Sequence, residues 1–169
     1  MQYRFDNLSP LDFEHLVGDL LTAQTGIEFE AFKVGPDGGI DLRGKSGEAI
    51  HIVQAKRYLK TSVSGLLTAA RKEAKAWRSR DIPNMYWFVT SLGLNPSDKA
   101  KLLEIFCEMP LTESRIIGHE QLQKMLRAHE KVTRAHMKLW LGETAMLENL
   151  LNYHSKMILM LHLQMLLSE

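Results

Sequence analysis

Features that would support a disulfide, a zinc site or secretion are missing from this sequence. Its 169 residues include a single cysteine, Cys107, which excludes an internal disulfide, and no Cys and His residues stand at zinc-binding spacing. Cys107 falls in an apolar helical pattern, so we expect a small buried side chain there. The N-terminus has no basic region followed by an apolar stretch, as a secretory signal would. These absences favour a reducing, cytoplasmic compartment.

The C-terminal apolar run is too short to cross a bilayer. It covers residues 157–167, fewer than the roughly 20 residues that a membrane-spanning helix needs, so we expect no membrane partner. From Thr144 onward the composition is helical and apolar almost all round, which requires burial against another surface. That surface is this domain, another subunit or a further part of a longer chain. We predict a homodimer or higher oligomer, or further domains, joined through these C-terminal helices.

The formal net charge of +1 conceals an uneven distribution along the chain. Residues 1–48 carry nine acidic and four basic side chains, whereas residues 49–80 carry eight Lys or Arg and one acid, Glu73. The remainder is close to balance. A basic block inside a near-neutral chain indicates a local anionic partner rather than a generally adhesive surface.

Hydrophobic periodicity and turn residues predict a single α/β domain. Ser9 and Pro10 suit a helix start, and Gly26 suits its end. Strands alternate with helices in the second half, which favours a mixed sheet flanked by helices. The predicted helices cover residues 10–25, 63–79, about 95–107 and 119–129. The predicted strands cover residues 27–34, 41–45, 49–57, 85–90 and 115–117.

Polar residues come together at one end of the predicted hairpin. A tight turn between its strands places Asp41 opposite about residues 52–54. Gln54 and Lys56 share a face because side chains alternate along a strand. The Asp41 carboxylate, the Gln54 amide oxygen and the Ala55 carbonyl are hard oxygen ligands suited to a divalent cation. Lys56 would then stand beside the attacking water and the charge that develops on a phosphodiester.

Glu14 is a candidate for the same site. Its helical neighbours Leu11, Val17 and Leu21 place the carboxylate at the edge of the apolar stripe of the first helix. A carboxylate in such a position needs a partner. The alternative is that Glu14 simply reaches solvent.

These segments resemble the Mrr-like restriction endonucleases, a branch of the PD-(D/E)XK nuclease superfamily. The resemblance covers about residues 8–92 well and the rest loosely. It implies an α/β restriction-endonuclease-like fold, with a mixed central sheet of about five strands flanked by helices, over residues 1–130. A C-terminal helical extension would cover residues 131–169. The similar segments are residues 11–16 (Leu-Asp-Phe-Glu-His-Leu), 35–41 (Gly-Pro-Asp-Gly-Gly-Ile-Asp), 53–58 (Val-Gln-Ala-Lys-Arg-Tyr) and 88–91 (Phe-Val-Thr-Ser).

The resemblance also implies a role for each site residue. Asp41 is similar to the metal-binding aspartate, Gln54 occupies the position usually held by a second acid, and Lys56 corresponds to the motif lysine. Glu14 matches an acid often present on the first helix. Because a neutral amide binds Mg²⁺ less strongly than a carboxylate, we expect Glu14 or Asp37 to supplement the charge of the site. The implied cofactor is Mg²⁺, with Mn²⁺ as a substitute.

The implied activity is hydrolysis of DNA to leave 5′-phosphates, in bacterial defence against foreign DNA. Residues 128–141 resemble the segment that follows such nuclease domains in larger bacterial defence proteins. The basic block fits double-stranded DNA, because a row of cations neutralises successive phosphates without reading sequence. The predicted DNA-binding residues are Arg57, Lys60, Arg71, Lys75 and Arg78.

Two other functions stay open at this point. The first is a non-catalytic module that uses a nuclease-like fold for DNA binding or for assembly. The weak ligand Gln54 and the apolar C-terminal run favour this alternative. An RNase is the second alternative.

Overall fold

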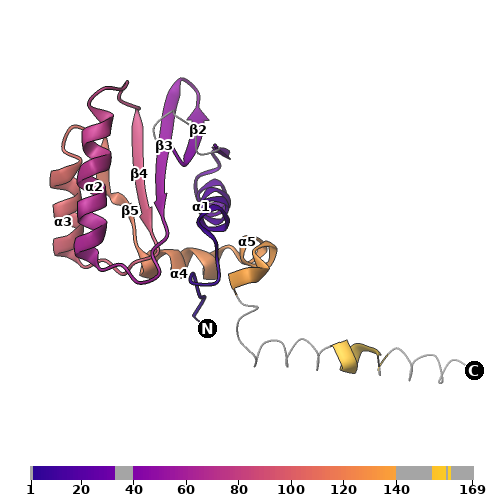
Figure 1. Cartoon of the computed structure of the whole chain (residues 1–169). Coiled ribbons are helices and arrows are strands. Elements are labelled where there is room, and N and C mark those ends of the chain that lie inside the picture. Colours follow the sequence, from indigo (N-terminus) through magenta and orange to yellow (C-terminus); the bar gives the residue numbers. More distant parts are fainter. Residues whose placement is uncertain (1, 33–39, 140–153, 159, 161–169) are drawn as a thin grey trace, which may run out of the picture.

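The computed structural model describes residues 2–32, 40–139, 154–158 and 160. These residues form an α/β domain around a five-stranded mixed sheet in the order β1-β2-β3-β4-β5. Figure 1 shows helix α1 on one face of the sheet and helices α2 and α3 on the other. The predicted mixed central sheet flanked by helices is therefore confirmed.

Helix α1, Pro10–Thr25, begins and ends where its sequence signals place it. The Ser9 side chain accepts a hydrogen bond from the Asp12 backbone N–H, and the Asp12 carboxylate accepts one from the Ser9 backbone in return. This reciprocal cap satisfies two backbone donors that the first helical turn leaves free. Gly26 ends the helix at φ 73°, a conformation that glycine adopts without a Cβ penalty. The predicted helix over residues 10–25 is confirmed.

Three antiparallel strands carry the first half of the sheet: β1 Phe29–Ala31, β2 Leu42–Ser46 and β3 Ala49–Lys56. Ser46 pairs with Ala49, and Gly47 at φ 59° forms the tight turn between β2 and β3. Strand β1 is shorter than the predicted 27–34. The turn cluster that contains Asp37 lies outside the described residues, which exclude 33–39.

The second half alternates helices with parallel strands. The elements are α2 Val63–Trp77, β4 Met85–Thr90, α3 Pro96–Ile105, β5 Leu111–Ile117 and α4 His119–Ala128. Strand β4 pairs in parallel with both β3 and β5. This arrangement turns the carboxyl ends of β3, β4 and β5 toward the same edge of the sheet.

Strand β5 starts four residues before the predicted segment 115–117. Its first half is Leu111-Thr112-Glu113-Ser114, whose last three side chains are exposed. Because β5 is an edge strand, these polar residues face water and hide the alternation that marks a half-buried strand.

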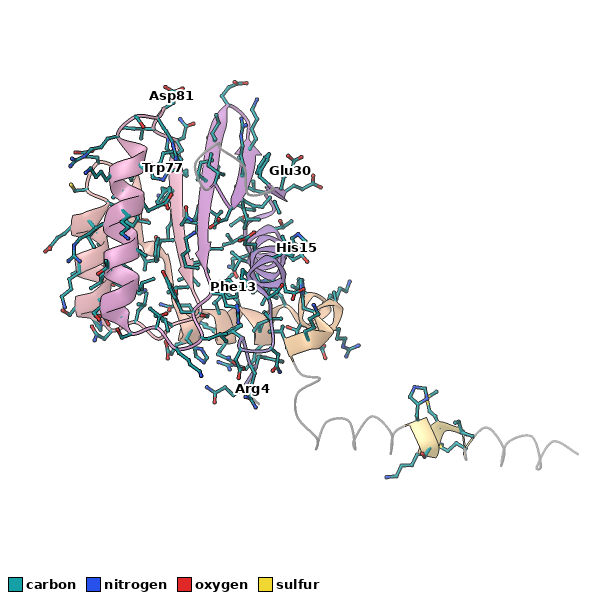
Figure 2. All side chains as sticks on the ribbon, in the orientation of Figure 1. Arg4, Phe13, His15, Glu30, Trp77 and Asp81 are labelled. Carbon is teal, nitrogen blue, oxygen red and sulfur yellow. The ribbon has the colours of Figure 1, made fainter. Side chains whose placement is uncertain are left out.

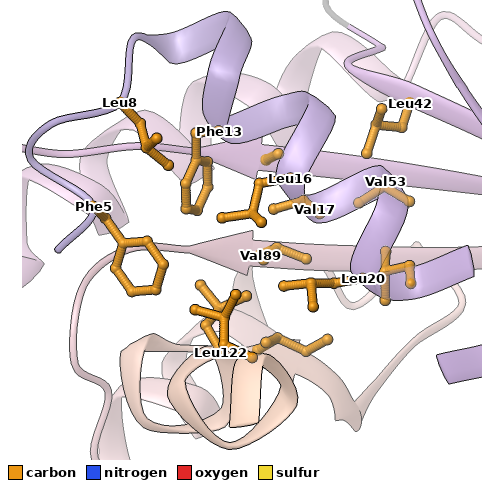
Figure 3. Packing of buried hydrophobic residues seen from close by; sticks show 14 of the residues in the cluster. Phe5, Leu8, Phe13, Leu16, Val17, Leu20, Leu42, Val53, Val89 and Leu122 are labelled. Atoms are coloured by element: carbon orange, nitrogen blue, oxygen red, sulfur yellow. The ribbon is translucent and has the colours of Figure 1, made fainter. Parts of the chain in front are cut away.

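Two apolar cores lie on the two faces of the sheet. On one face, residues of α1 and α4 such as Phe13, Leu16 and Leu122 pack on Val53 and Val89 of the central strands (Figure 3). Phe13 is fully buried, whereas His15, two residues further along α1, is exposed (Figure 2). The helical period therefore divides α1 into a buried stripe and a solvent face.

The core on the other face lies between the sheet and helices α2 and α3. It includes Ile52 of β3, Tyr86 and Phe88 of β4, and Trp77 of α2. Trp77 and Tyr86 meet edge to face with ring centroids 5.7 Å apart. Figure 2 shows Trp77 between α2 and the sheet.

The expected burial of Cys107 is wrong. Helix α3 ends at Ile105, and Phe106 caps it with a backbone N–H bonded to the Leu102 carbonyl. Cys107 therefore lies in the turn that follows, where its side chain is exposed. The apolar pattern continued past the end of the helix, so periodicity alone placed Cys107 on a buried face.

Residues that follow α4 also pack on α1. Helix α5, Glu130–Ala135, and a 3-10 turn, Met137–Leu139, continue the chain, and Leu139 is buried in the α1 core. The Lys138 ammonium lies 2.8 Å from the Asp12 carboxylate at the start of α1. The division of the chain at residues 130 and 131 stays a prediction.

The described part of the C-terminal run is helical and apolar. Residues 154–158 and 160 have helical backbone, and the side chains of Met157, Ile158 and Met160 are 45%, 57% and 65% exposed. The rest of the predicted C-terminal helix lies outside the described residues. Within the part of the chain that the structure describes, no helix is long and apolar enough to cross a bilayer.

Candidate catalytic site

Asp41 is the centre of the polar cluster at the end of the hairpin. It immediately precedes β2, and the pairing of Leu42 with Val53 sets it beside Gln54. One carboxylate oxygen, Oδ2, accepts hydrogen bonds from Gln54 Nε2 at 2.7 Å, the Ala55 backbone N–H at 2.7 Å and Lys56 Nζ at 3.4 Å. The geometry that the hairpin predicted is therefore present.

The cluster lies on the α2 side of the sheet. Leu42, Val53 and Ala55 point into the α1 core, so their neighbours on the same strands point the opposite way. Gln54 and Lys56 thus follow Ile52, which packs in the core beneath α2 and α3. Polar side chains continue a line of apolar ones, as expected at the rim of a core.

Burial makes ionisation of the Asp41 carboxyl group unfavourable. Gln54 is completely buried, and the Asp41 side chain is 12% exposed, whereas the Lys56 side chain is 34% exposed. Burial raises the pKa of Asp41, and the Lys56 ammonium and the Ala55 N–H oppose that rise without cancelling it. A second positive charge at this carboxylate would therefore be favourable.

The oxygen of the Gln54 amide is the second notable group. Gln54 Oε1 is shielded from solvent and accepts no hydrogen bond from the residues that the structure describes. A buried oxygen of this kind needs a donor, a water or a cation. The amide nitrogen faces Asp41, and half a turn about the terminal side-chain torsion would exchange the two atoms.

These donors fit a magnesium ion that keeps much of its water. Mg²⁺ sites in proteins often use one or two carboxylates and retain several water ligands. The Asp41 carboxylate and Gln54 Oε1 are hard oxygen donors of the required kind. Among the described residues, no three His, Cys, Asp or Glu side chains gather as a metal-binding group. Ala55 contacts Asp41 through its N–H, and its predicted role as a carbonyl ligand stays a prediction.

The carboxyl group of Glu14, on α1, interacts electrostatically with residues of the site. Burial raises the pKa of its carboxyl group, and the Asp41 carboxylate adds to the rise while Lys56 opposes it. Glu14 is half-buried rather than free in solvent. Its participation in the site therefore stays a prediction. The electrostatic interaction of its carboxyl group with Asp41 and Lys56 supports that prediction.

Glu73 is a residue of this region that sequence reasoning did not nominate. It is half-buried on α2, and burial raises the pKa of its carboxyl group. Lys56 lowers that pKa, and Asp41 raises it by a smaller amount. The sequence could have indicated Glu73, because Glu73 is the single acid of residues 49–80 and stands four residues before the buried Trp77.

The predicted DNA-binding residues divide into two groups. Arg57 and Lys60 lie in the loop after β3, next to Lys56, and the Tyr58 backbone N–H anchors this loop to Ser91 Oγ at 2.8 Å. The other group is exposed on α2 and lines a cavity of about 730 Å³ between α2 and α3. That group consists of Arg71, Lys75 and Arg78.

Comparison with known proteins agrees with this geometry. Residues 5–78 match the Mrr-type family model described as "Restriction endonuclease". The chain is also similar to the uncharacterized protein y4cD of Sinorhizobium fredii (strain NBRC 101917 / NGR234), with 39% identity over 148 residues. That alignment covers 88% of this chain and 23% of the relative, so the chain spans about a quarter of the relative's length. No solved structure matches the chain.

The family match covers α1 and the hairpin, which position Glu14, Asp41, Gln54 and Lys56, and it also covers α2. Divalent metal ions are typical of the restriction-endonuclease-like domains that this fold represents. Residues 5–78, within a five-stranded mixed sheet flanked by helices, are therefore similar to the restriction endonuclease domains of the Mrr-like family.

Proposed function

We propose that this domain is an Mg²⁺-dependent endonuclease that hydrolyses phosphodiester bonds in double-stranded DNA. The observation that carries the proposal is the largely buried Asp41 carboxylate with donors from Gln54, Ala55 and Lys56 on one of its oxygens. A desolvated carboxylate beside an unpartnered amide oxygen favours a divalent cation, and the adjacent ammonium suits a phosphodiester substrate.

The residues of the cluster have separate tasks in this reaction. Asp41 and Gln54 Oε1 would hold Mg²⁺, which when bound polarises a phosphate oxygen and lowers the pKa of a bound water. Lys56 orients the attacking water and offsets the negative charge that develops on the phosphate. Hydrolysis would leave a 5′-phosphate, as the family resemblance implies.

Basic side chains would hold the duplex through its phosphates. Arg57 and Lys60 are the nearer group, because they directly follow Lys56 in the chain. The α2 group of Arg71, Lys75 and Arg78 would extend the contact along the duplex. Phosphate contacts of this kind give affinity and position without sequence preference.

The proposed biological role is bacterial defence against foreign DNA. The chain matches 23% of a much longer relative, which supports a nuclease domain that works with further domains. The competing function is a non-catalytic DNA-binding or assembly module. The neutral Gln54, at a position usually held by an acid in the superfamily, favours that second reading.

Cleavage of supercoiled plasmid distinguishes the two functions. We expect nicking with Mg²⁺ or Mn²⁺, none with Ca²⁺ or a chelator, and a rate at least about 100-fold lower for Asp41→Asn. The control Asp81→Asn removes an exposed acid and should cleave at the wild-type rate. Equal nicking by wild type and Asp41→Asn would reject the site. Retardation of DNA in a gel without cleavage would favour the binding module, and faster cleavage of single-stranded RNA would indicate an RNase.

A further inference from the structure

We infer that Glu73 is a positioning residue of the proposed site, where it serves as a second counter-ion for the Lys56 ammonium. The inference rests on the proposed function, because it assigns a task to Glu73 in the same reaction. In the superfamily pattern a strand acid precedes the lysine by two positions, and here that position holds the neutral Gln54. Glu73 would supply the missing negative charge from α2.

The position of Glu73 on its helix brings it to the site side of α2. Leu66, Ala70 and Trp77 are the buried residues of the sheet-facing stripe. Glu73 follows Ala70 by three positions and precedes Trp77 by four, so it lies on the same stripe. The exposed residues Arg71, Lys75 and Arg78 lie on another side, around the cavity between α2 and α3.

The half-buried Glu73 carboxylate lacks a close partner. Its Oε1 is shielded from solvent and accepts no hydrogen bond from the described residues. Among those residues, no Lys or Arg nitrogen comes within ion-pair distance of it. The strongest charge acting on Glu73 is that of Lys56, ahead of Asp41 and Arg80. A half-buried carboxylate with a shielded, unpartnered oxygen can accept a hydrogen bond from an ammonium that moves toward it.

Lys56 is the side chain that we expect to change position when a divalent cation binds to Asp41. Its contact with Asp41 Oδ2, at 3.4 Å, is the longest of the three contacts that share this oxygen. A divalent cation on Asp41 would repel the ammonium, because like charges in a poorly solvated site interact strongly. Four flexible methylenes allow Lys56 to turn toward Glu73 while its backbone stays in β3. Glu73 would then hold the ammonium beside the reacting phosphate.

A double-mutant cycle between Glu73 and Lys56 tests this role. The variants are Glu73→Gln, Lys56→Met and the pair combined, with Glu73→Asp as a second variant that keeps the charge. We expect Glu73→Gln to lower kcat for nicking about tenfold with KM for DNA within about twofold, and to have no further effect in Lys56→Met. Glu73→Asp should recover part of the loss.

Two measurements do not depend on cleavage. With ¹³C-labelled lysine, the Lys56 ε-methylene signal, assigned by its absence in Lys56→Met, should shift in Glu73→Gln when Ca²⁺ is present. Calorimetric Ca²⁺ affinity should change less than about twofold in Glu73→Gln and fall at least about tenfold in Asp41→Asn. Arg80→Met is the matched control, because Arg80 is the other cation acting on Glu73.

The outcomes separate this inference from the proposed function. Additive effects of Glu73→Gln and Lys56→Met would reject the pairing, and so would coupling of Glu73 to Arg80 alone. Loss of Ca²⁺ affinity in Glu73→Gln equal to that in Asp41→Asn would make Glu73 a cation ligand and overturn its role toward Lys56. Absence of cleavage by the wild type would reject the proposed function. In that case an unmoved Lys56 signal rejects the pairing, and a shifted one supports it.

Discussion

At the scale of single residues, the site concentrates negative charge in a poorly solvated place. Burial is the largest cause of the raised pKa of Glu14, Asp41 and Glu73. Lys56 acts on all three as the opposing cation. Because burial still raises the pKa of all three carboxyl groups in the presence of this ammonium, a divalent cation would find a favourable electrostatic setting here.

The contribution of these acids to the stability of the cation-free protein should fall as pH rises through their pKa values. A carboxyl group with a raised pKa binds more protons when folded than when unfolded, starting near the ordinary glutamate value of 4.5. Ionisation at higher pH is therefore unfavourable to folding. The double variant Glu14→Gln, Glu73→Gln should be more stable than wild type at pH 7 by about 1 kcal/mol, and equal to it at about pH 4 or below.

Thermal unfolding between about pH 4 and pH 8 without divalent cations measures this difference. Glu30→Gln serves as the control, because Glu30 is exposed on β1 (Figure 2). A stability gain that stays constant across the pH range would show that ionisation of these acids does not contribute. Addition of Mg²⁺ should stabilise the wild type more than the double variant.

At the scale of elements, α2 presents different chemistry on its different sides. The stripe toward the sheet carries Trp77 and Glu73, and the exposed side carries Arg71, Lys75 and Arg78 around the cavity with α3. Arg78 is also 3.4 Å from Glu108, an exposed pair that contributes little stability. The helix therefore links the proposed site to a basic surface that lies beyond it.

The two basic groups should differ in their effect on DNA binding. Each phosphate contact that is lost lowers the slope of log affinity against log salt by about 1. We expect the pair Arg57→Gln, Lys60→Gln to lower this slope by about 2 and to reduce cleavage as well. The triple variant Arg71→Gln, Lys75→Gln, Arg78→Gln should lower the slope by up to about 3 while cleavage at saturating DNA is kept.

Fluorescence anisotropy of labelled duplex in Ca²⁺ at several salt concentrations gives these slopes. Lys99→Gln on α3, outside the lining of this cavity, is a single-charge control for the triple variant. An unchanged slope in the triple variant would show that the α2 group does not contact the duplex. Loss of cleavage at saturating DNA in that variant would contradict the separation of the two groups.

At the scale of the whole molecule, one domain holds one candidate site, and duplex DNA has two strands. A double-strand break then requires two domains or two successive encounters. The exposed apolar side chains Met157, Ile158 and Met160 offer a surface for a second copy or for further domains. We therefore expect nicked circles to appear first and linear DNA to increase more than proportionally with protein concentration.

The mass of the protein in solution tests this assembly. The variant Met157→Gln, Ile158→Gln, Met160→Gln should have the mass of a monomer and form linear DNA more slowly, with the rate of nicking unchanged. Lys156→Gln, an exposed polar neighbour, is the control and should keep the wild-type mass. A monomeric wild type with linear DNA proportional to protein concentration would contradict assembly through this surface.

Much of the site followed from short-range sequence rules. Ser9, Asp12 and Gly26 set both ends of α1 because capping depends on residues within one helical turn. The tight turn at Gly47 set the register that brings Asp41 beside Gln54, because a two-residue connection leaves little freedom in the pairing. Alternation along β3 then placed Lys56 on the same face. These interactions are local, so the sequence by itself determined them.

Tertiary structure decided what local rules could not reach. Glu73 comes near the site because α2 packs over β3 and β4, where Trp77 of α2 and Tyr86 of β4 share one core. Cys107 is exposed because α3 ends at Ile105, which the apolar pattern did not reveal. The division of the basic residues into two groups depends on where α3 packs against α2. The position of Glu73 and the cavity between α2 and α3 depend on contacts between elements distant in sequence, and no periodicity within one element encodes such contacts.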